Sequence, residues 1–383
     1  MSAKLQSALL ISVQGIGNTV LMTPVITSLT DKGYEVDTIV SDNGSDEIVA
    51  LTGNVRKRYL WIEHDGVIRN LMRLRLELRQ ARYDEAYALY PNGKRENVLL
   101  CLARASRKTR YSDPRYYYRL LDFLPPRKKA PFKRSHDLNS NLKLAGIGDS
   151  DSSRKAHLGV TSEAREFANQ FFGSSDLSDK FVVALHPGGG GLAKRWSESK
   201  YVDLCLRLAQ DRSVRLLVFG SQSEESLVHS ITQRLSDRAA SVCGLSIDKV
   251  TALLARSNLL IGNDSALAHI ASAMEVPVVA IWGYTDFYRA APVNSKGLLL
   301  RIDYPCSPCY EFATGYIEDC QFHLKCIKNI SAEQVHGIVK RYIELIRNCE
   351  TAQPEVFASE PGVGKLERLE SGCLMIDLQA SLQ

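Results

Sequence analysis

Four consecutive glycines, Gly188–Gly191, form the stretch of this sequence best suited to binding an anion, and Lys194 and Arg195 follow them closely. The glycines come directly after an apolar run that predicts a strand, and a predicted helix begins just beyond. Backbone N–H groups of glycines can form an anion-binding nest, and the two cations suit a diphosphate. The stretch is not a P-loop, which requires Gly-Lys followed by Ser or Thr. The alternative is a flexible loop with incidental charges.

A second polar turn separates two apolar runs that predict strands, Leu259–Ile261 and Val276–Trp282. The predicted helix between them covers Ser265–Met274. In such a βαβ unit the turn and the helix N-terminus lie at the carboxyl edge of the sheet, where anions bind. Asp264 in the turn and His269 on the helix are the side chains that we expect to contact a ligand. Alternatively, Asp264 only caps the helix and His269 is a core histidine.

Near the N-terminus, a strand predicted over Ser7–Val13 leads into a glycine turn, Gln14–Asn18, and then a predicted helix, Thr19–Leu29. Strand, glycine turn and helix open a Rossmann-like half, and the glycines let a ligand approach the backbone closely. The dinucleotide fingerprint G-x-G-x-x-G is incomplete, because Val20 stands where the third glycine would be. The sequence therefore disfavours an NAD-dependent oxidoreductase.

Alternating strands and helices run through both halves of the 383 residues, which predicts two parallel sheets covered by helices. We expect an N-terminal Rossmann-like domain over 1–150 and a C-terminal one over 151–349, with the boundary in the polar stretch 148–154. Residues 350–383 combine prolines, glycines and charges without a sustained period, and this predicts a mobile tail.

Positive charge is concentrated in residues 1–150, which carry 24 Lys and Arg against 16 Asp and Glu, whereas the remainder carries 24 against 27. This asymmetry indicates an anionic partner, unless it is merely a solvated basic face. Residues 67–81 predict a basic amphipathic helix. Such a helix can lie on an anionic membrane surface, but an ordinary sheet-packing helix with a solvated outer face is the reading that we favour.

The sequence indicates a cytoplasmic protein. No run reaches the roughly 18 apolar residues that a membrane helix needs, and the first residues lack the cleavage site of a signal peptide. The nine cysteines are odd in number and unevenly spread, which favours a reduced chain over a disulfide scaffold.

Four of the cysteines, Cys306, Cys309, Cys320 and Cys326, have a spacing that can hold zinc tetrahedrally. The second interval is longer than that of a common zinc knuckle. We therefore expect no metal, and treat these thiols as a weak candidate site. The preferred alternative is a compact loop whose thiols are buried but unligated.

Taken together, these motifs resemble glycosyltransferase family 9, whose best-known members are the ADP-heptose:lipopolysaccharide heptosyltransferases. The resemblance covers roughly residues 5–345, in the order of the family. The segments that carry it are GIGNTVLMTPVITSL (Gly15–Leu29), ALYPNGKRENVLLCLARASRKTRY (Ala88–Tyr111), the helix that begins at His136, HPGGGGLAKRW (His186–Trp196), FGSQSEE (Phe219–Glu225), GNDSALAHIASA (Gly262–Ala273) and WGYTD (Trp282–Asp286).

The resemblance implies a GT-B architecture, in which two Rossmann-like domains face each other across a cleft. The C-terminal domain would bind a nucleoside diphosphate sugar, with ADP favoured, and Lys194 would hold its phosphates. The other implied donor-binding residues are Gly188, Gly189, Glu224, Asp264, Ser265, Ala266 and His269. The N-terminal domain would bind the acceptor at Gly15, Gly17 and Asn18. No cofactor is required, and no nucleic acid partner is expected.

Two residues depart from the family pattern. The family has a catalytic Asp as general base where this chain has Asn18, and an amide cannot take up a proton at neutral pH. Ala266 stands where the family usually has Gly. Asn18 can still orient the acceptor, so we assign Asn18 and Lys194 to catalysis.

The function expected from the resemblance is inverting transfer of heptose or a related sugar to a cell-envelope glycolipid or polysaccharide. The enzyme would be cytoplasmic, with peripheral association at the inner face of the membrane through its basic half. The alternative is a catalytically silent GT-B protein that binds nucleotide sugars or glycans, because Asn18 cannot act as a base.

Overall fold

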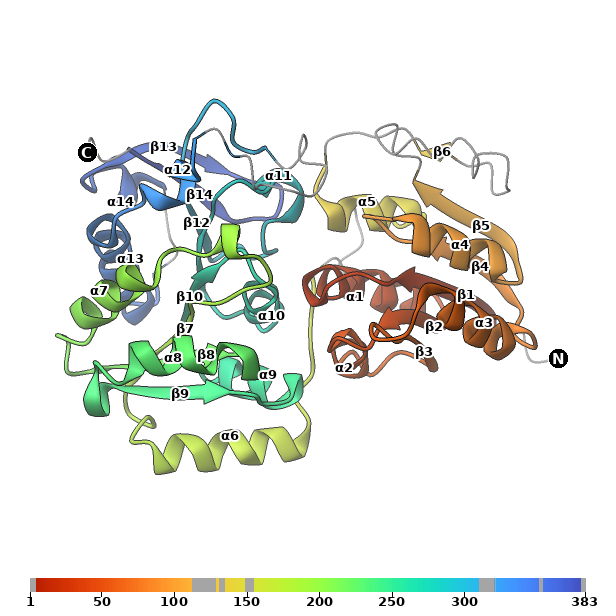
Figure 1. The fold of residues 1–383 in the computed structure, drawn as a ribbon, viewed down its shortest axis with the longest axis horizontal. Coiled ribbons are helices and arrows are strands. Elements are labelled where there is room, and N and C mark those ends of the chain that lie inside the picture. Colours follow the sequence, from red (N-terminus) through yellow and green to blue (C-terminus); the bar gives the residue numbers. More distant parts are fainter. Residues whose placement is uncertain are drawn as a thin grey trace. The chain divides into compact units, whose positions relative to one another are not determined.

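The computed structural model describes residues 5–111, 129–130, 135–148, 155–309, 320, 322–350 and 354–379. The chain forms two compact units, Met1–Gly159 and Val160–Gln383, and each is built on its own sheet (Figure 1). The boundary expected from the sequence, at 150, lies outside the described residues. The α/β class and the two Rossmann-like units are confirmed, while the cleft between them stays a prediction.

The first unit has a sheet of parallel strands in the order β3-β2-β1-β4-β5-β6. The strands are β1 (Gln6–Ser12), β2 (Tyr34–Ser41), β3 (Lys57–Trp61), β4 (Tyr83–Ala88), β5 (Ala105–Tyr111) and β6 (Lys129–Ala130). The helices are α1 (Ile16–Asp31), α2 (Ser45–Ala50), α3 (Val67–Leu78), α4 (Lys94–Leu102) and α5 (Asp137–Leu144). The order reverses between β1 and β4, so the carboxyl ends of these two strands border the crevice where such sheets bind ligands.

The core of the first unit explains why β1 is central. Leu9 and Ile11 are fully buried, and they pack in one cluster with Ile39 of β2 and with Leu74 and Leu99, which come from α3 and α4. A strand covered on both faces has a continuous apolar run, and in β1 this run is Ala8–Ile11.

The second unit has a larger sheet, ordered β13-β14-β12-β11-β10-β7-β8-β9, in which β13 pairs antiparallel to β14 and the other pairs are parallel. The strands are β7 (Phe181–His186), β8 (Val214–Gly220), β9 (Ala239–Cys243), β10 (Leu259–Asn263), β11 (Val278–Ile281), β12 (Gly297–Ile302), β13 (Val363–Arg368) and β14 (Leu374–Leu378).

The α-helices of the second unit are α6 (Ser162–Ser174), α7 (Glu198–Leu208), α8 (Glu225–Thr232), α9 (Ile247–Ala255), α10 (Ala266–Ala273), α11 (Phe287–Ala290), α12 (Lys325–Lys328), α13 (Ala332–Arg347) and α14 (Pro354–Ala358). Short 3-10 turns cover Leu192–Lys194, Gln222–Glu224 and Ser236–Arg238. The strand order reverses between β7 and β10. The glycine loop after β7 and the start of α10 are therefore neighbours at the carboxyl edge of this sheet.

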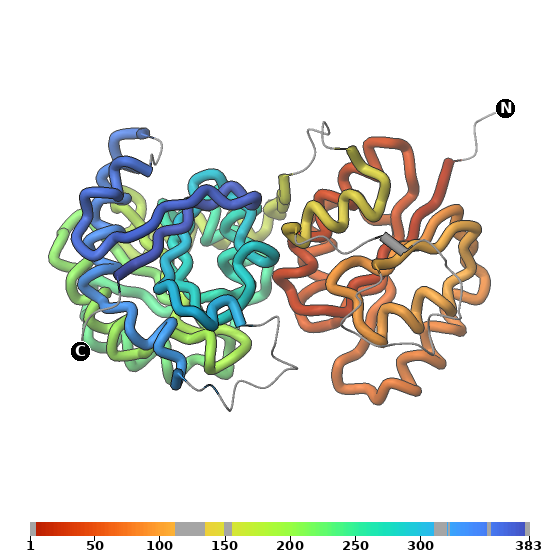
Figure 2. The backbone as a smooth tube through the Cα atoms, turned by 90° about the horizontal axis from the view of Figure 1, so that it is seen from above, coloured from red at the N-terminus to blue at the C-terminus, as the bar shows by residue number. Residues whose placement is uncertain are grey.

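The mobile tail expected over 350–383 is wrong for the residues that the structure describes. Strand β14 is buried at every position and pairs with β12, and Phe357 of α14 is fully buried in the core of the second unit. Arg301 of β12 also forms a buried ion pair of 2.9 Å with Asp377 of β14. Figure 2 shows this segment, in dark blue, running back over the second unit. A strand buried on both faces does not alternate between apolar and polar residues. The five residues of β14 therefore gave no periodic pattern from which a strand could be predicted.

Candidate functional site

The glycine loop after β7 is fixed in place by a single side chain from the neighbouring strand. Asn263, the last residue of β10, is fully buried, and its amide donates to the carbonyl groups of Pro187 and Gly188 at 2.9 Å each. Its oxygen accepts from the backbone N–H of Trp196 and from the hydroxyl of Tyr201, both at 3.0 Å. Since every polar atom of this amide is used, the loop is held against β10 and is not the flexible segment of the alternative reading.

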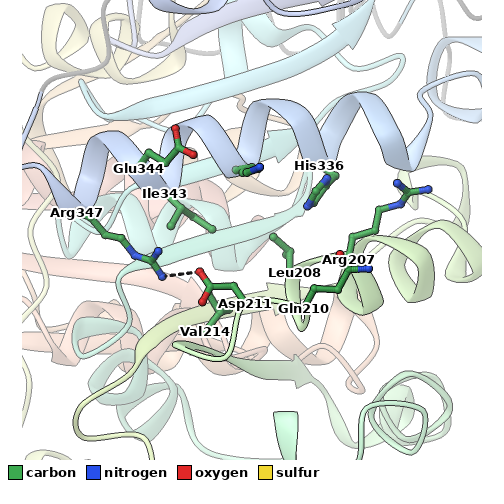
Figure 3. A pocket seen from close by; sticks show the side chains of 10 residues that line it. Arg207, Leu208, Gln210, Asp211, Val214, His336, Ile343, Glu344 and Arg347 are labelled. Carbon is green, nitrogen blue, oxygen red and sulfur yellow. Dashed lines mark ion pairs between the residues drawn. The ribbon is translucent and has the colours of Figure 1, made fainter.

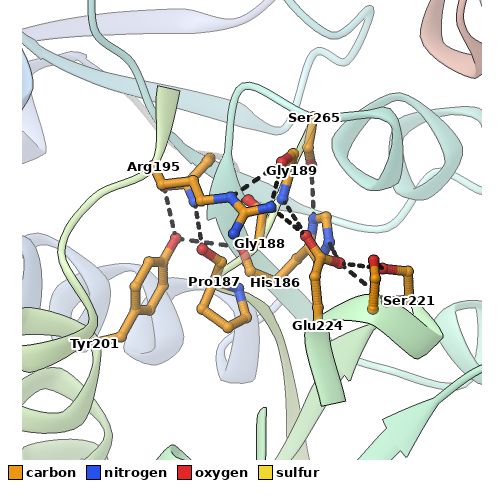
Figure 4. Close-up of polar contacts among 11 residues, drawn as sticks. His186, Pro187, Gly188, Gly189, Arg195, Tyr201, Ser221, Glu224 and Ser265 are labelled. Carbon is orange, nitrogen blue, oxygen red and sulfur yellow. Dashed lines mark hydrogen bonds and ion pairs between the residues drawn. The ribbon is translucent and has the colours of Figure 1, made fainter. Parts of the chain in front are cut away.

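Glu224 clamps the other side of the same loop (Figure 4). One carboxylate oxygen accepts from the backbone N–H of Gly189 and from the guanidinium of Arg195, both at 2.8 Å. The other accepts from the N–H and the hydroxyl of Ser221 at 2.9 Å each, as part of a capping box. The carboxylate therefore joins the loops that follow β7 and β8, and one of the glycine N–H groups is already occupied.

This packing explains why two of the glycines are required. A Cβ atom on Gly188 would lie 2.2 Å from a carboxylate oxygen of Glu224, so any side chain there would displace the clamp. Gly189 has φ +133°, a conformation that residues with side chains rarely adopt. The two positions therefore keep the backbone close to Glu224.

The surroundings of Glu224 keep it ionised. The nearby His186 imidazole lowers the pKa of the carboxyl group, as do the N–H groups of Ser221 and Gly189, and together they outweigh the opposing effect of burial. The imidazole Nε2 lies 3.7 Å from a carboxylate oxygen, whereas the N–H groups of Gly189 and Ser221 donate directly at 2.8 and 2.9 Å. The pKa of Glu224 falls well below its usual value of 4.5.

Lys194 and Asp264 form an ion pair that joins the glycine loop to the start of α10. The ammonium nitrogen and a carboxylate oxygen are 2.6 Å apart, with side chains 29% and 9% exposed. The same oxygen accepts from the Thr285 hydroxyl at 2.7 Å. The lysine is thus at the loop where a phosphate would bind, and a phosphate would share it with Asp264.

The N-terminus of α10 adds a second anion-binding feature. Ser265 occupies the N-cap position, but its hydroxyl contacts Nδ1 of His186 at 2.9 Å and does not cap the helix. The N–H groups of the first turn, which begins at Ala266, are therefore left without a side-chain cap and can receive an anionic oxygen. His269 is buried one turn further along the helix.

The sequence-predicted donor residues thus gather at one edge of the second sheet. The loop with Gly188 and Gly189, the lysine at its end and the uncapped start of α10 all follow β7 or β10, which are hydrogen-bonded neighbours. Backbone N–H groups, a helix dipole and an ammonium group together suit a diphosphate. Such a cradle can also stabilise negative charge that develops on a departing phosphate.

The acceptor residues predicted from the sequence occupy the corresponding edge of the first sheet. Helix α1 begins at Ile16, earlier than expected, so Gly15 is its N-cap residue and Gly17 and Asn18 lie in its first turn. The Asn18 side chain is half-buried and has no hydrogen-bond partner among the described residues.

A buried carboxylate holds the turn between β1 and α1 in place. Glu96, at the start of α4, accepts from the side-chain amide of Gln14 at 2.6 Å and from the N–H of Gly93 at 2.8 Å. It is only 1% exposed. This carboxylate therefore fixes the turn and does not offer a free base next to Asn18.

The comparisons with known proteins agree with this geometry. A sequence model described as glycosyltransferase family 9 (heptosyltransferase) matches residues 71–316, well over half of the chain. The chain belongs to glycosyltransferase family 9. The match spans the glycine loop, Glu224 and the start of α10, which are the parts described above.

Curated relatives have names that agree with the family. The chain is 31% identical over 170 residues to lipooligosaccharide heptosyltransferase 2 of Campylobacter jejuni, which covers 42% of this chain and 51% of that protein. It is 26% identical over 242 residues to lipopolysaccharide heptosyltransferase 2 of Escherichia coli K12, covering 59% and 67%. The chain therefore spans about half the length of the first relative and two thirds of the second.

Solved structures show that the fold is the GT-B fold of this family. A family 9 glycosyltransferase from Veillonella parvula superposes with a TM-score of 0.71 at 19% identity, over 91% of this chain and 99% of that one. The Escherichia coli ADP-heptose heptosyltransferase II gives a TM-score of 0.66 at 19% identity, over 89% and 100%.

The four cysteines suggested as weak metal ligands lie close enough to influence one another. Burial raises the pKa of Cys326 to about 12, with smaller contributions from Cys309, Cys306 and Cys320. Cys326 is buried and the other three are half-buried, and all four are free thiols. Within the described ranges no group of three or more His, Cys, Asp or Glu side chains is arranged to hold a metal ion. The glycine loop and the start of α10 contain none of these thiols.

A cavity of about 320 Å³ opens elsewhere in the second unit, between α7 and α13 (Figure 3). Its walls include Arg207 and Asp211 on one side and His336 and Arg347 on the other. Asp211 and Arg347 pair at 3.0 Å across it. The cavity shares no residue with the glycine loop, with Lys194 or with the start of α10.

Three residues of the cradle received no role from the sequence alone. Ser221 could have been found, because Ser221 and Glu224 have the spacing of a capping box. The sequence identified Asn263 only as a turn residue, and no sequence pattern indicated a role for Thr285. Their roles depend on neighbouring strands that are distant in sequence.

Proposed function

We propose that this family 9 protein is an inverting glycosyltransferase that moves heptose or a related sugar from a nucleoside diphosphate donor to a cell-envelope glycolipid or polysaccharide. The observation that carries the proposal is the meeting of the glycine loop, Lys194 and the uncapped start of α10 at one sheet edge. The names of the relatives supply the substrate classes, since they are lipopolysaccharide and lipooligosaccharide heptosyltransferases.

In this proposal the donor diphosphate lies against the loop at Gly188 and Gly189, while the N–H of Gly189 stays on Glu224. It binds to the backbone at Ser265 and Ala266, with Lys194 as its counter-charge. Glu224 holds the loop in shape and approaches the nucleoside or the sugar together with Asp264 and His269. ADP is the nucleotide that we favour, because one structural neighbour is an ADP-heptose heptosyltransferase and another, WaaC, was solved with ADP.

The proposed reaction breaks the bond between the anomeric carbon and the diphosphate while the acceptor hydroxyl attacks from the opposite face. Lys194 and the helix N-terminus stabilise the charge on the leaving diphosphate, so these protein groups can serve without a metal ion. Asn18, in the first turn of α1, orients the acceptor hydroxyl through its amide. The hydroxyl proton passes to water after the bond to the leaving diphosphate has largely broken. The acceptor-binding backbone is that of Gly15 and Gly17.

A second candidate function is a GT-B protein that binds nucleotide sugars or glycans without catalysis. Asn18 favours it, because a side-chain amide cannot remove the proton of the acceptor hydroxyl. The neighbouring carboxylate, Glu96, is buried and already accepts from Gln14 and Gly93.

The cradle can be tested by calorimetry with ADP and the Lys194→Ala variant. Loss of a hydrogen bond to a charged group should weaken binding by about 1.5–3 kcal/mol. Lys180→Ala is the matched control, because Lys180 precedes β7 at the opposite end of the strand. Equal affinity of wild type and Lys194→Ala would remove Lys194 from the site. Transfer or hydrolysis of an ADP-sugar by the wild type then separates the enzyme from the silent binder.

A further inference from the structure

Helix α3 (Val67–Leu78) presents apolar side chains on two opposite faces. Asn70, Leu74 and Leu78 are buried and form the inner face, where the two leucines pack in the core of the first unit. Ile68, Met72 and Leu76 recur at the same four-residue spacing, two residues out of phase with the inner set. Residues spaced in this way lie about 160° apart around an α-helix, so the second row points away from the core.

The outer row is unusually exposed for apolar side chains. Ile68, Met72 and Leu76 are 75%, 62% and 64% exposed, and Val67 at the start of the helix is 50% exposed. Within the described part of the chain, four of the eight exposed large apolar side chains lie on this one helix of twelve residues. Scattered exposed apolar residues need no explanation, but a contiguous row usually marks an interaction surface.

Arginines flank the apolar row. Arg75 and Arg79 are exposed on the same outer face, and neither has a carboxylate partner among the described residues. Arg69 is also on this side, and it pairs only with the surface carboxylate of Asp65 at 3.3 Å. The outer face of α3 therefore combines a row of apolar side chains with unneutralised positive charge, in the half of the chain that carries the excess of Lys and Arg.

We propose that the outer face of α3 docks on the surface of an anionic phospholipid bilayer. Apolar side chains that enter the acyl boundary, beside cations that meet lipid phosphates, are the pattern of interfacial helices. A surface that binds a protein partner usually has aromatic side chains at its centre. The outer face of α3 has none. Among the described helices, none has both the length and the apolar content to cross a membrane.

This inference takes up the membrane-surface alternative of the sequence analysis, in place of the ordinary packing helix with a solvated outer face that the sequence favoured. The inner face does pack on the sheet, but the outer face is not polar. It goes beyond the proposed function, because α3 shares no residue with the nucleotide cradle. The two can therefore fail independently.

The test is co-sedimentation of the full chain with phosphatidylglycerol vesicles and with phosphatidylcholine vesicles. The wild type should bind the anionic vesicles and be released as the salt concentration rises, since screening weakens contacts with lipid phosphates. Arg75→Gln combined with Arg79→Gln should lower the partition coefficient roughly 30-fold, which corresponds to about 1 kcal/mol for each cation. Ile68→Ser, Met72→Ser and Leu76→Ser together should lower it at least about tenfold.

Matched controls lie on the second unit. Arg165→Gln combined with Lys340→Gln removes the same charge from exposed positions, and Leu206→Ser removes an exposed leucine of α7. Both controls should bind vesicles like the wild type, and all variants should keep the wild-type circular dichroism and ADP affinity.

Equal binding of the wild type to neutral and anionic vesicles, or unchanged binding by both α3 variants, would overturn the proposal. So would sedimentation velocity showing that the wild type dimerises without binding vesicles and that the triple serine variant is a monomer. In that case a second copy of the chain covers this face. If the wild type bound anionic vesicles but did not bind ADP, only the proposed function would be contradicted.

Discussion

The ammonium group of Lys194 and the carboxylate of Asp264 lie 2.6 Å apart, and they join the loops that follow two neighbouring strands, β7 and β10. The pair sits where the glycine loop meets the start of α10. A diphosphate bound there would compete with Asp264 for the same cation, and would also be repelled by it. In the proposed function, the pair would set how strongly this site attracts a nucleotide.

Replacing Asp264 with Asn should tighten the binding of ADP. The amide is the same size and still accepts from the Thr285 hydroxyl, but it removes a negative charge from beside the phosphates. A gain of about tenfold in affinity, or about 1.4 kcal/mol, is expected in calorimetry. Asp203→Asn is the control, because Asp203 pairs with Arg207 on an exposed helix face. Weaker binding by Asp264→Asn would instead show that the carboxylate positions Lys194 for the phosphate.

Glu224 should make the stability of the second unit depend on pH. The nearby His186 and the N–H groups of Ser221 and Gly189 depress the pKa of the folded-state carboxyl below 4.5, the value expected when unfolded. A depressed pKa means that the stabilisation is fully present above about pH 4.5 and is lost as the pH falls toward the folded-state pKa. Glu224→Gln places an NH₂ group opposite an N–H donor. It should therefore lower the free energy of unfolding by roughly 1.5–3 kcal/mol near pH 7.

Urea denaturation at several pH values measures this effect. The difference between wild type and Glu224→Gln should be constant at neutral pH and shrink below about pH 4.5. Glu225→Gln, the exposed neighbour, should show no such trend. A difference that persists unchanged into acid would mean that the carboxylate charge is not what stabilises the loop.

The sequence predicted most of the cradle because its parts are local. Four glycines after an apolar strand, and a polar turn before the α10 helix, are patterns that can be read within a few residues. What it could not predict is the connection between them. Asn263 holds the glycine loop 75 and 76 residues away in sequence, and Glu224 holds it 35 residues away. These contacts exist only because β10 and β8 lie on either side of β7.

The C-terminal segment was misread for a related reason. Its prolines, glycines and charges lie in α14, in β13 and in the turns between these elements, and they obscured β14, a short strand that is buried at every position. The start of α1 was also placed too late, since glycines were taken as turn residues although Gly17 lies inside the helix. Burial by tertiary neighbours decided the first case.

Phe357 tests directly whether the C-terminal segment belongs to the core. It is fully buried and packs edge-on against Tyr342 of α13, with ring centroids 6.3 Å apart. Phe357→Ala should lower the free energy of unfolding by about 3–5 kcal/mol, the usual cost of removing a buried ring. Glu355→Ala, on the exposed side of α14, should change it by less than about 0.5 kcal/mol. A mobile tail would make both substitutions neutral.

Substitutions of Asn18 distinguish the two proposed functions, because we expect Asn18→Asp and Asn18→Ala to change turnover in opposite directions. It lies in the first turn of α1, where the helix dipole favours a negative charge, so an aspartate introduced there would be ionised at neutral pH. Asn18→Asp should therefore preserve or raise turnover, since general-base catalysis is typically worth about 100- to 10,000-fold. Asn18→Ala should lower turnover by about fivefold to tenfold, because only an orienting hydrogen bond is lost. Initial rates with donor and acceptor, at saturating donor, measure both effects.

The control for this comparison is Asn54→Asp, which adds the same charge at an exposed position of the first unit. ADP affinity should be the same in all four proteins, because in the proposed function Asn18 contacts the acceptor and not the nucleotide. If Asn18→Ala matches the wild type and Asn18→Asp gives no gain, Asn18 has no catalytic role. If the wild type transfers no sugar while Asn18→Asp does, the natural protein is the silent binder. Its fold then retains the proposed nucleotide cradle and lacks only the base, because an amide replaces a carboxylate in the first turn of α1.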